Sequence, residues 1–293
     1  MYNGIINVYK EAGFTSHDVV AKLRGILKQK KIGHTGTLDS DATGVLPVCL
    51  GSGTKLCDML TDKSKEYRAV MLLGKTTDTE DISGKVLSEN SVNVSEDEII
   101  TVINSFVGKY EQIPPMYSAL KVNGQKLCDL ARKGVEIERK PRPVEINEIT
   151  IEKIDFPEVT MLIKCSKGTY IRSLCRDIGE KAGCGACMKS LVRTRVGIFK
   201  LEEAHTLQEI SERTADMSIE SLITPVDNLF SEYERIIVVG RNEMLVKNGN
   251  MFKTDIYSGT DVRVYLSDGT FAGIYTFDTD NFFYKPKKMF LGG

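Results

Sequence analysis

Residues 33–48, GHTGTLDSDATGVLPV, combine loop chemistry and core chemistry within one short stretch. Glycines stand at positions 33, 36 and 44, and His34 and two aspartates lie between them. Glycine permits backbone conformations that other residues avoid, whereas the apolar run that follows is typical of a buried strand. No regular helix or strand needs this mixture. We therefore predict a shaped loop that leads into a buried strand and presents polar side chains in a cleft.

Three kinds of site could use such a loop, and its spacing argues against two of them. A phosphate-binding loop needs GxxxxGK[ST] or GxGxxG, and neither pattern occurs in this stretch. A calcium loop that starts at Asp39 needs a glutamate at its twelfth position, where the chain has Leu50. The third possibility is one reactive acid, because an ionised carboxylate can serve as a nucleophile. For Asp39 alone, a turn or helix-capping role is the alternative.

The rest of the chain alternates short apolar runs with capped amphipathic segments, which indicates a protein of mixed α and β structure. Helices are predicted to begin at Thr15 or Ser16, at Ser95 and near Ile171. Beyond residue 231, short strand-like runs separated by Gly and Asp predict a small β-rich domain. Strands are predicted at 5–8, at 45–50, as a hairpin-like pair within 65–87, and at 146–165.

Charge is distributed unevenly along the chain, although the net charge is only −1. Residues 121–200 carry 17 Lys and Arg against 10 Asp and Glu, whereas residues 201–293 carry 9 against 15. A groove for nucleic acid needs such a basic region, and a lysine-rich solvated surface is the alternative. Segment 111–145 is rich in Pro, Gly, Lys and Arg. We predict that it forms an arm or mobile loop that contacts an acidic partner.

Composition argues against several other classes of protein. No apolar run approaches the ~20 residues of a membrane-spanning helix, and the N-terminal stretch lacks the pattern of a secretion signal. The seven cysteines form no disulfide framework, which predicts reduced thiols in the cytoplasm. Cys184 and Cys187 have the spacing of half a zinc site, but no second pair follows. We therefore predict buried or inert thiols and no metal site.

Six blocks of sequence, in the same order, resemble the TruB family of tRNA pseudouridine synthases. The resemblance covers about residues 4–200, and the C-terminal part resembles the PUA-type module that often follows. Six ordered blocks make the resemblance highly specific. The blocks are YKEAGFTSHDVV, KIGHTGTLDSDATGVLPVCLGSGTK, KEYRAVMLLGKTTDTED, QIPPMYSALKVNGQKLCDLARKG, CSKGTYIRSLCRDIG and SLVRTRVGIF.

The resemblance implies an α+β fold, with a mixed, largely antiparallel sheet, flanking helices and a small C-terminal β-rich PUA-like domain. It implies a catalytic domain at 1–230, with a thumb-like insertion at about 111–145, and the PUA-like domain at 231–293. The implied reaction is the isomerisation of uridine to pseudouridine at position 55 in the T loop of tRNA, without a redox cofactor, ATP or metal. The implied partner is tRNA alone, with no guide RNA and no membrane, and the implied enzyme is a cytoplasmic monomer.

The resemblance also assigns roles to single residues. Asp39 matches the essential aspartate, which attacks C6 of the base or C1′ of the sugar, or removes the 2′ proton. Arg172 matches the arginine that pairs with this carboxylate, and we expect it to keep the pKa of Asp39 low. His34 matches the residue that fills the space left by the flipped base. Three further residues match the lining of the uracil pocket: Tyr67, Tyr170 and Leu191.

The insertion matches the arm that closes over the T stem-loop in the family. Its basic side chains are expected to pair with phosphates as a group, which gives salt-sensitive affinity. They are Lys121, Lys126, Arg132, Lys133, Arg139, Lys140 and Arg142.

The chain departs from the family pattern at two positions. The family has proline where this chain has Glu11 and Ser40, so we expect a looser loop around Asp39. A guide-RNA-dependent synthase and a tRNA-folding factor are the alternative functions. The compact length and the lack of lysine-rich tails argue against the first, and the presence of Asp39, Tyr67 and Arg172 argues against a factor without catalysis.

Overall fold

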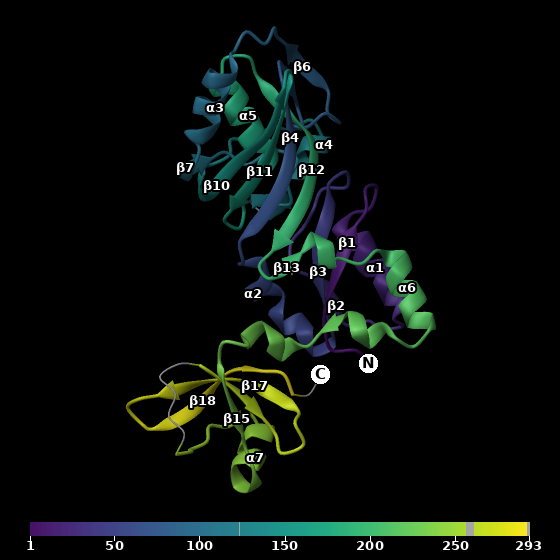
Figure 1. Ribbon diagram of the computed structural model, residues 1–293, viewed down its shortest axis with the longest axis vertical. Coiled ribbons are helices and arrows are strands. Elements are labelled where there is room, and N and C mark those ends of the chain that lie inside the picture. Colours follow the sequence, from purple (N-terminus) through teal and green to yellow (C-terminus); the bar gives the residue numbers. More distant parts are fainter. Residues whose placement is uncertain (123, 256–260, 292–293) are drawn as a thin grey trace.

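The computed structural model describes residues 1–122, 124–255 and 261–291. Its largest element is a ten-stranded mixed sheet (Figure 1). Among the described strands of this sheet, β3 and β12 pair in parallel and all other pairs are antiparallel. This confirms the α+β fold with a largely antiparallel sheet. In spatial order the strands are β14 (Ile223–Thr224), β1 (Gly4–Lys10), β3 (Thr43–Leu50), β12 (Ala186–Val196), β4 (Lys65–Leu73), β11 (Glu158–Cys165), β10 (Arg142–Asp155) and β7 (Gly108–Gln112), with β2 (Ile32–His34) beside β3 and β13 (Phe199–Lys200) beside β12.

The helices begin where the sequence places capping residues. Thr15 accepts a hydrogen bond from the Asp18 amide while Asp18 accepts one from the Thr15 amide, and Ser95 and Glu98 form the same capping box. These boxes confirm the predicted starts of α1 and α3. The α-helices are α1 (Ser16–Ile26), α2 (Cys57–Thr61), α3 (Glu96–Asn104), α4 (Leu127–Arg132), α5 (Ile171–Lys181), α6 (Leu207–Ala215) and α7 (Gly240–Lys247), and the 3-10 helices are η1 (Gly51–Leu56), η2 (Leu201–Glu203), η3 (Ile219–Leu222) and η4 (Val226–Phe230).

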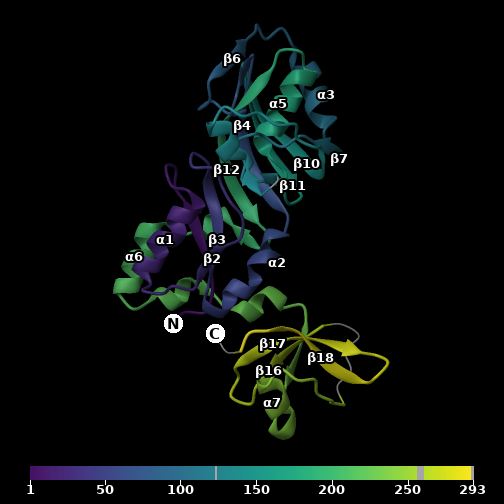
Figure 2. The same ribbon diagram turned by 180° about the vertical axis from the view of Figure 1, so that it is seen from behind.

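The large sheet runs through two lobes (Figure 2). Each lobe has its own hydrophobic core, and a third core covers the opposite face of β1 and β3. In one lobe α1 and α6 pack on β1 and β3, and in the other α3 and α5 pack on β4, β10, β11 and β12. The parallel contact of β3 with β12, at residues 43–44 and 192–193, joins the lobes. The loop that carries Asp39 connects β2 to β3 at this junction. Its neighbours Leu38 and Ala42 pack into the core of the second lobe.

The hairpin-like pair predicted within 65–87 is wrong in its pairing. The first strand, β4, lies in the centre of the large sheet between β11 and β12. The hairpin is formed by the shorter β5 (Lys75–Thr77) and β6 (Val86–Glu89), which make a separate two-stranded sheet. The partners of β4 lie about 100 residues further along the chain, so no local pattern identifies them.

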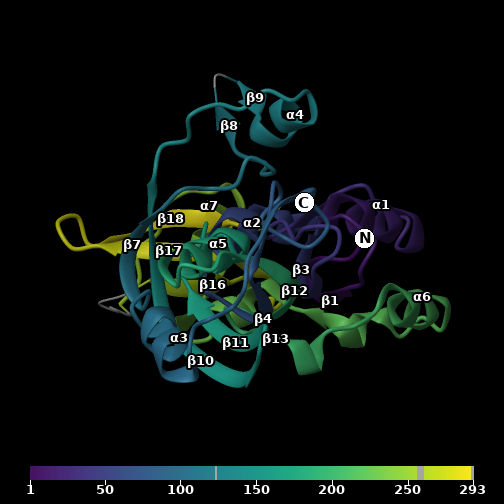
Figure 3. The ribbon, with the colours of Figure 1, turned by 90° about the horizontal axis from the view of Figure 1, so that it is seen from above.

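Segment 113–141 projects from the body of the molecule as an arm (Figure 3). Its tip holds α4 and the hairpin of β8 (Lys121–Val122) and β9 (Gln125–Lys126). Its two ends leave the sheet side by side, because Gln112 on β7 pairs with Arg142 on β10. The arm is therefore narrower than the predicted 111–145, since the residues at both ends of that range are strands of the sheet.

The C-terminal part of the chain, which begins with β15 at Glu234, forms its own four-stranded sheet and its own hydrophobic core. Ile274 and Phe290 from this part pack against Leu60 and Phe230 of the preceding part. Helices α6 and α7 are not among the predicted elements: the Thr206 side chain caps α6, whereas Val239, the N-cap of α7, makes no side-chain capping bond. None of the helices in the described residues has the length and apolar character needed to span a membrane. The strands are β15 (Glu234–Ile237), β16 (Val262–Tyr265), β17 (Phe271–Asp278) and β18 (Phe283–Met289).

Candidate active site

The loop that carries Asp39 is anchored by its backbone. The Lys10 ammonium, buried at the end of β1, donates hydrogen bonds to the carbonyls of Ser40 (3.0 Å) and Ala42 (2.6 Å). The Gly13 amide donates a second hydrogen bond to the Ser40 carbonyl, at 3.0 Å. Ser40, which stands where the family pattern has proline, is thus held by two hydrogen-bond donors. On the other side of Asp39, the Leu38 amide donates to the Ser16 hydroxyl at 2.9 Å, so hydrogen bonds on both sides counter the expected looseness.

Gly44 lets strand β12 approach the end of this loop. Its φ is +105°, a conformation that residues with a Cβ rarely adopt, and a Cβ there would lie 2.3 Å from the Arg193 carbonyl oxygen. A larger residue would separate β3 from β12 at the place where they join the two lobes. The glycine of the sequence motif is therefore required by close packing as well as by backbone shape.

Asp39 and Arg172, which are 133 residues apart in the chain, form a two-point ion pair. Arg172 Nε lies 3.0 Å from Asp39 Oδ2, and Nη2 donates to Oδ1 at 3.3 Å. The Arg172 side chain is only 6% exposed, whereas that of Asp39 is 47% exposed. A fixed cation therefore orients a carboxylate that a substrate can still reach.

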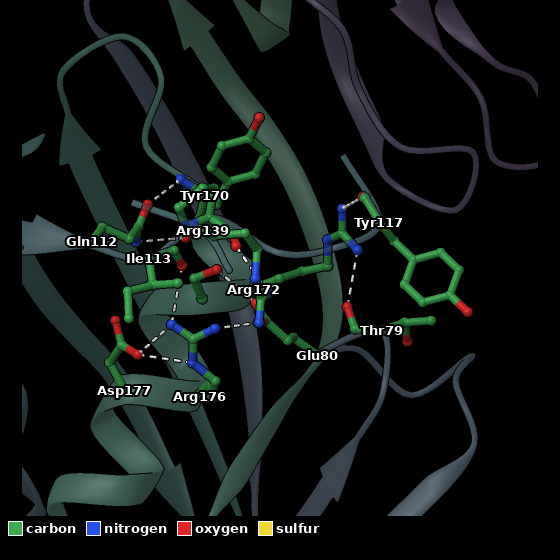
Figure 4. A network of polar contacts seen from close by, with 12 residues as sticks. Thr79, Glu80, Gln112, Ile113, Tyr117, Arg139, Tyr170, Arg172, Arg176 and Asp177 are labelled. Carbon is green, nitrogen blue, oxygen red and sulfur yellow. Dashed lines mark hydrogen bonds and ion pairs between the residues drawn. The ribbon is translucent and has the colours of Figure 1, made fainter. Parts of the chain in front are cut away.

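Arg172 is itself held by three further groups, two of which appear with it in Figure 4. Its Nη1 donates to the Thr79 carbonyl at 2.9 Å and its Nη2 to the Tyr117 carbonyl at 2.8 Å. The Asp81 carboxylate lies 3.5 Å from Nη1. Because every side of the guanidinium has a partner, its orientation toward Asp39 is fixed.

The pKa of Asp39 is raised above its ordinary value, contrary to our expectation that Arg172 would keep it low. Removal of water from around the carboxyl is the main cause, and the neighbouring Asp81 carboxylate adds to the rise. Arg172 and Lys10 oppose it without reversing it. The sequence identified the cation but gave no sign of the second carboxylate or of the desolvation.

The three residues predicted to line a uracil pocket lie on elements around this pair. Tyr67 on β4 is directly opposite Arg193 on β12, and Leu191 precedes it on the same strand, opposite Ala69. Tyr67 and Leu191 are buried in one hydrophobic core with Leu38, the residue before Asp39. Tyr170 is the N-cap of α5, two residues before Arg172. The fold thus brings Tyr67, Leu191 and Tyr170 into the neighbourhood of Asp39.

Arg193 is a completely buried cation that joins the loop to this wall. It is 1% exposed, and it donates to the carbonyls of Val45 at 2.7 Å and Gly36 at 3.3 Å. Burial raises the pKa of the Tyr67 hydroxyl, and a hydrogen bond with Arg193 opposes the rise. Nothing in the block SLVRTRVGIF predicts these contacts of Arg193 with the loop.

His34 ends strand β2 at the edge of the same loop. The ring is half-buried, its Nδ1 accepts a hydrogen bond from the Gly36 amide at 3.3 Å, and it meets the His17 ring edge-on with centroids 5.3 Å apart. Burial lowers the pKa of His34, and the nearby His17 and Arg193 lower it further. At neutral pH the ring is therefore uncharged.

This arrangement predicts a measurable coupling between two of the three histidines of the chain. In the variant His17→Ala, the pKa of His34 should rise, because the change removes a neighbouring ring that lowers this pKa and part of the burial that disfavours protonation. Titration of the ring signals by NMR measures the shift. A fall in the His34 midpoint would contradict the geometry.

Six of the seven basic residues predicted to meet phosphates are exposed. Arg139 is the exception. Its Nη1 donates to the Pro114 carbonyl at 3.1 Å, and its side chain is 19% exposed. We therefore correct its assignment, because it ties together the two ends of the arm. The exposed residues are Lys121, Lys126, Arg132, Lys133 and Lys140 on the arm, and Arg142 at the start of β10.

Comparison with known proteins agrees with this geometry. Residues 24–171 match the model of the TruB family pseudouridylate synthase N-terminal domain, and residues 172–231 match that of the tRNA pseudouridylate synthase B C-terminal domain. Similar curated proteins include tRNA pseudouridine synthase B of Lachnoclostridium phytofermentans, 54% identical over 99% of this chain and 100% of that protein. The protein of the same name from Clostridium tetani is 47% identical over 91% of this chain and 93% of its own.

Similar solved structures carry the same fold. A chain of an H/ACA RNP bound to a substrate RNA containing 2'-deoxyuridine is 25% identical with a TM-score of 0.71, over 99% of this chain and 85% of that one. A chain of a Cbf5-Nop10-Gar1 complex is 27% identical with the same TM-score, over 98% of this chain and 85% of that one. With an Asp–Arg pair at the junction of the sheet and family matches that together span residues 24–231, the chain belongs to the TruB family of pseudouridylate synthases.

Proposed function

We propose that this chain converts uridine to pseudouridine at position 55 in the T loop of tRNA, with Asp39 as the catalytic carboxylate. The observation that carries the proposal is the Asp39–Arg172 pair, an accessible carboxylate whose two oxygens face a buried guanidinium at 3.0 and 3.3 Å. A relative that matches the chain from end to end is tRNA pseudouridine synthase B, which supports tRNA as the substrate.

The reaction needs one well-placed carboxylate and a pocket that holds a loosened base. The N1–C1′ bond breaks, the uracil turns while it stays bound, and C5 bonds to C1′ as the C5 proton leaves and N1 takes one up. No atom is gained or lost overall. Asp39 supplies the nucleophile or base, and Tyr67 and Leu191 supply an aromatic face and an apolar wall for the base.

The target base must leave its stack before Asp39 can reach it. Extrusion costs a few kcal/mol, which contacts with the vacated loop can offset. We assign this role to His34, because its half-buried, uncharged ring lies at the end of β2 beside the loop that presents Asp39. The ring can stack on a base or form a hydrogen bond with one.

The exposed cations of the arm are proposed to pair with phosphates of the T stem. Replacing both Lys121 and Lys126 by glutamine should weaken tRNA binding and flatten its salt dependence, by about 1.5 to 2 in the slope of log Kd against log salt. Binding titrations between low and moderate salt measure this slope. The matched control changes two lysines of the sheet outside the arm, Lys153→Gln with Lys164→Gln, which should leave the slope unchanged. An unaltered slope in the arm variant would exclude these phosphate contacts.

We assign residues 1–230 to the catalytic domain and residues 231–293 to a PUA-like domain that contacts the acceptor side of the tRNA. The separate four-stranded sheet and its own core support this division. We further propose that the enzyme acts as a monomer, because Asp39, Arg172 and Tyr67 all come from one chain. We place it in the cytoplasm, since its seven cysteines are free thiols, as expected in a reducing compartment.

We propose that no guide RNA takes part. The chain covers 100% of the tRNA pseudouridine synthase B relative but only 85% of the chain in the Cbf5-Nop10-Gar1 complex, which favours the first kind of protein. The test is to incubate the purified protein with an unmodified tRNA transcript alone and to map pseudouridine by mass spectrometry. Modification at position 55 only, lost in a transcript with cytidine there, is the expected result. If the transcript is modified only when a second, guide RNA is added, the proposal is contradicted.

A further inference from the structure

We propose that Glu80 is a positioning residue, which holds the turn at 77–81 against α5 and so keeps Arg172 in the orientation that presents Asp39. The inference rests on the proposed catalytic role of Asp39. The comparisons identify the family, and the roles of Asp39 and Arg172 come from matching its motifs, whereas Glu80 is singled out by its contacts alone.

The Glu80 carboxylate binds two side chains of the helix that carries Arg172. Its Oε2 accepts a hydrogen bond from the Ser173 hydroxyl at 2.6 Å, and its Oε1 forms an ion pair with Arg176 (Figure 4). The Glu80 side chain is only 9% exposed. A carboxylate this buried is stable because both oxygens have partners, and it fixes the turn to two residues of α5 that lie almost one helical turn apart.

Thr79 and Asp81, the residues on either side of Glu80, both contact Arg172. The Thr79 carbonyl accepts from Arg172 Nη1 at 2.9 Å, and the Asp81 carboxylate lies 3.5 Å from the same nitrogen. The Glu80 carbonyl also accepts from the Met188 amide on β12, at 3.0 Å. The turn is thus fixed between α5 and β12, so a shift at Glu80 moves two partners of Arg172 together.

The backbone of Glu80 requires this support. Its φ is +65°, in the left-handed region that residues with a Cβ rarely occupy. Such a conformation persists where the surroundings determine it, and here the carboxylate contacts do so. If the carboxylate contacts are weakened, the backbone at Glu80 can relax to a more favourable conformation.

The same network reaches the arm. Arg176 Nη2 donates to the Ile113 carbonyl at 3.1 Å, and Arg172 Nη2 donates to the Tyr117 carbonyl at 2.8 Å. A cavity of about 730 Å³ lies between α5 and the returning segment of the arm at Val135 and Glu136. Polar contacts at the start of the arm therefore connect it to α5 beside this cavity.

The test measures single-turnover rates and tRNA affinity for Glu80→Gln, alone and together with Arg172→Lys. Glutamine keeps the size of the side chain but loses the charge that pairs with Arg176. Alone, the change should lower the rate about tenfold and leave the Kd for tRNA within about twofold. In the Arg172→Lys background, its further effect should be less than about twofold, because Glu80 acts through Arg172.

A control and a milder variant make the result decisive. Glu66→Gln removes a carboxylate that accepts from Thr194 and pairs with Arg195, and it should leave the rate unchanged. If Glu80→Gln does not fold, Ser173→Ala removes one partner of the carboxylate and should show a smaller rate loss with the same dependence on Arg172. A rate loss of equal size in both backgrounds, or none, overturns the inference. If Asp39→Asn keeps its activity, the proposed catalytic role of Asp39 fails, independently of Glu80.

Discussion

Replacing Asp39 by asparagine should reduce pseudouridine formation by more than about 10⁴-fold and change the affinity for tRNA by less than about threefold. Asparagine has the same shape and still accepts a hydrogen bond from Arg172. It carries no charge, however, and it is neither a nucleophile nor a base. Rate and binding are measured separately, by single-turnover mapping of pseudouridine and by titration with labelled tRNA.

The same loop offers the control for this variant. Asp41 lies two residues further along and is exposed like Asp39, so Asp41→Asn changes the same charge in the same loop. It should keep activity within about threefold, since no catalytic role is assigned to it. Comparable losses in both variants would show that the charge of the loop, and not the Asp39 carboxylate, supports the reaction.

Replacing Arg172 by lysine should lower the rate about a hundredfold with a much smaller effect on tRNA affinity. The guanidinium contacts both oxygens of Asp39 and also the carbonyls of Thr79 and Tyr117. A lysine keeps the charge, but its single nitrogen cannot bridge these groups. The carboxylate would then be paired without being oriented.

The measurement for Arg172→Lys is again rate against affinity, accompanied by a thermal unfolding curve. Arg195→Lys is the control, because Arg195 lies on β12 and pairs with Glu66 while its side chain is 40% exposed. That variant should retain the full rate. Equal losses of rate and affinity in Arg172→Lys would instead identify Arg172 as a contact to the RNA backbone.

Several elements followed from signals within a few residues of the sequence, although α6 was missed despite its side-chain cap at Thr206. The capping boxes at Thr15 and Ser95 start α1 and α3 as predicted, because the bonds that form them join residues three apart. The apolar run after Gly44 became the buried strand β3. Helix α7 lacks such a side-chain cap and was missed.

Partners distant in the chain could not be predicted in the same way. The pairing of β4 with β11 and β12 was mistaken for a local hairpin, since register depends on strands that fold against it from far along the chain. Arg139 was counted with the phosphate-binding side chains because charge alone does not show which way a side chain turns. Its hydrogen bond to the Pro114 carbonyl joins the two ends of the arm instead.

The sequence by itself determined the kind of protein, the loop that presents Asp39 and the identity of its cation. The resemblance of six ordered blocks to the TruB family carries that information along the chain. Only the tertiary structure decided how the acid is held and how strongly it is ionised. Lys10, Asp81 and Arg193 come from three separate segments, and their effects on the loop and its charges depend on distance and burial. Folding sets these distances and this burial, and the residues next to Asp39 in the sequence do not specify them.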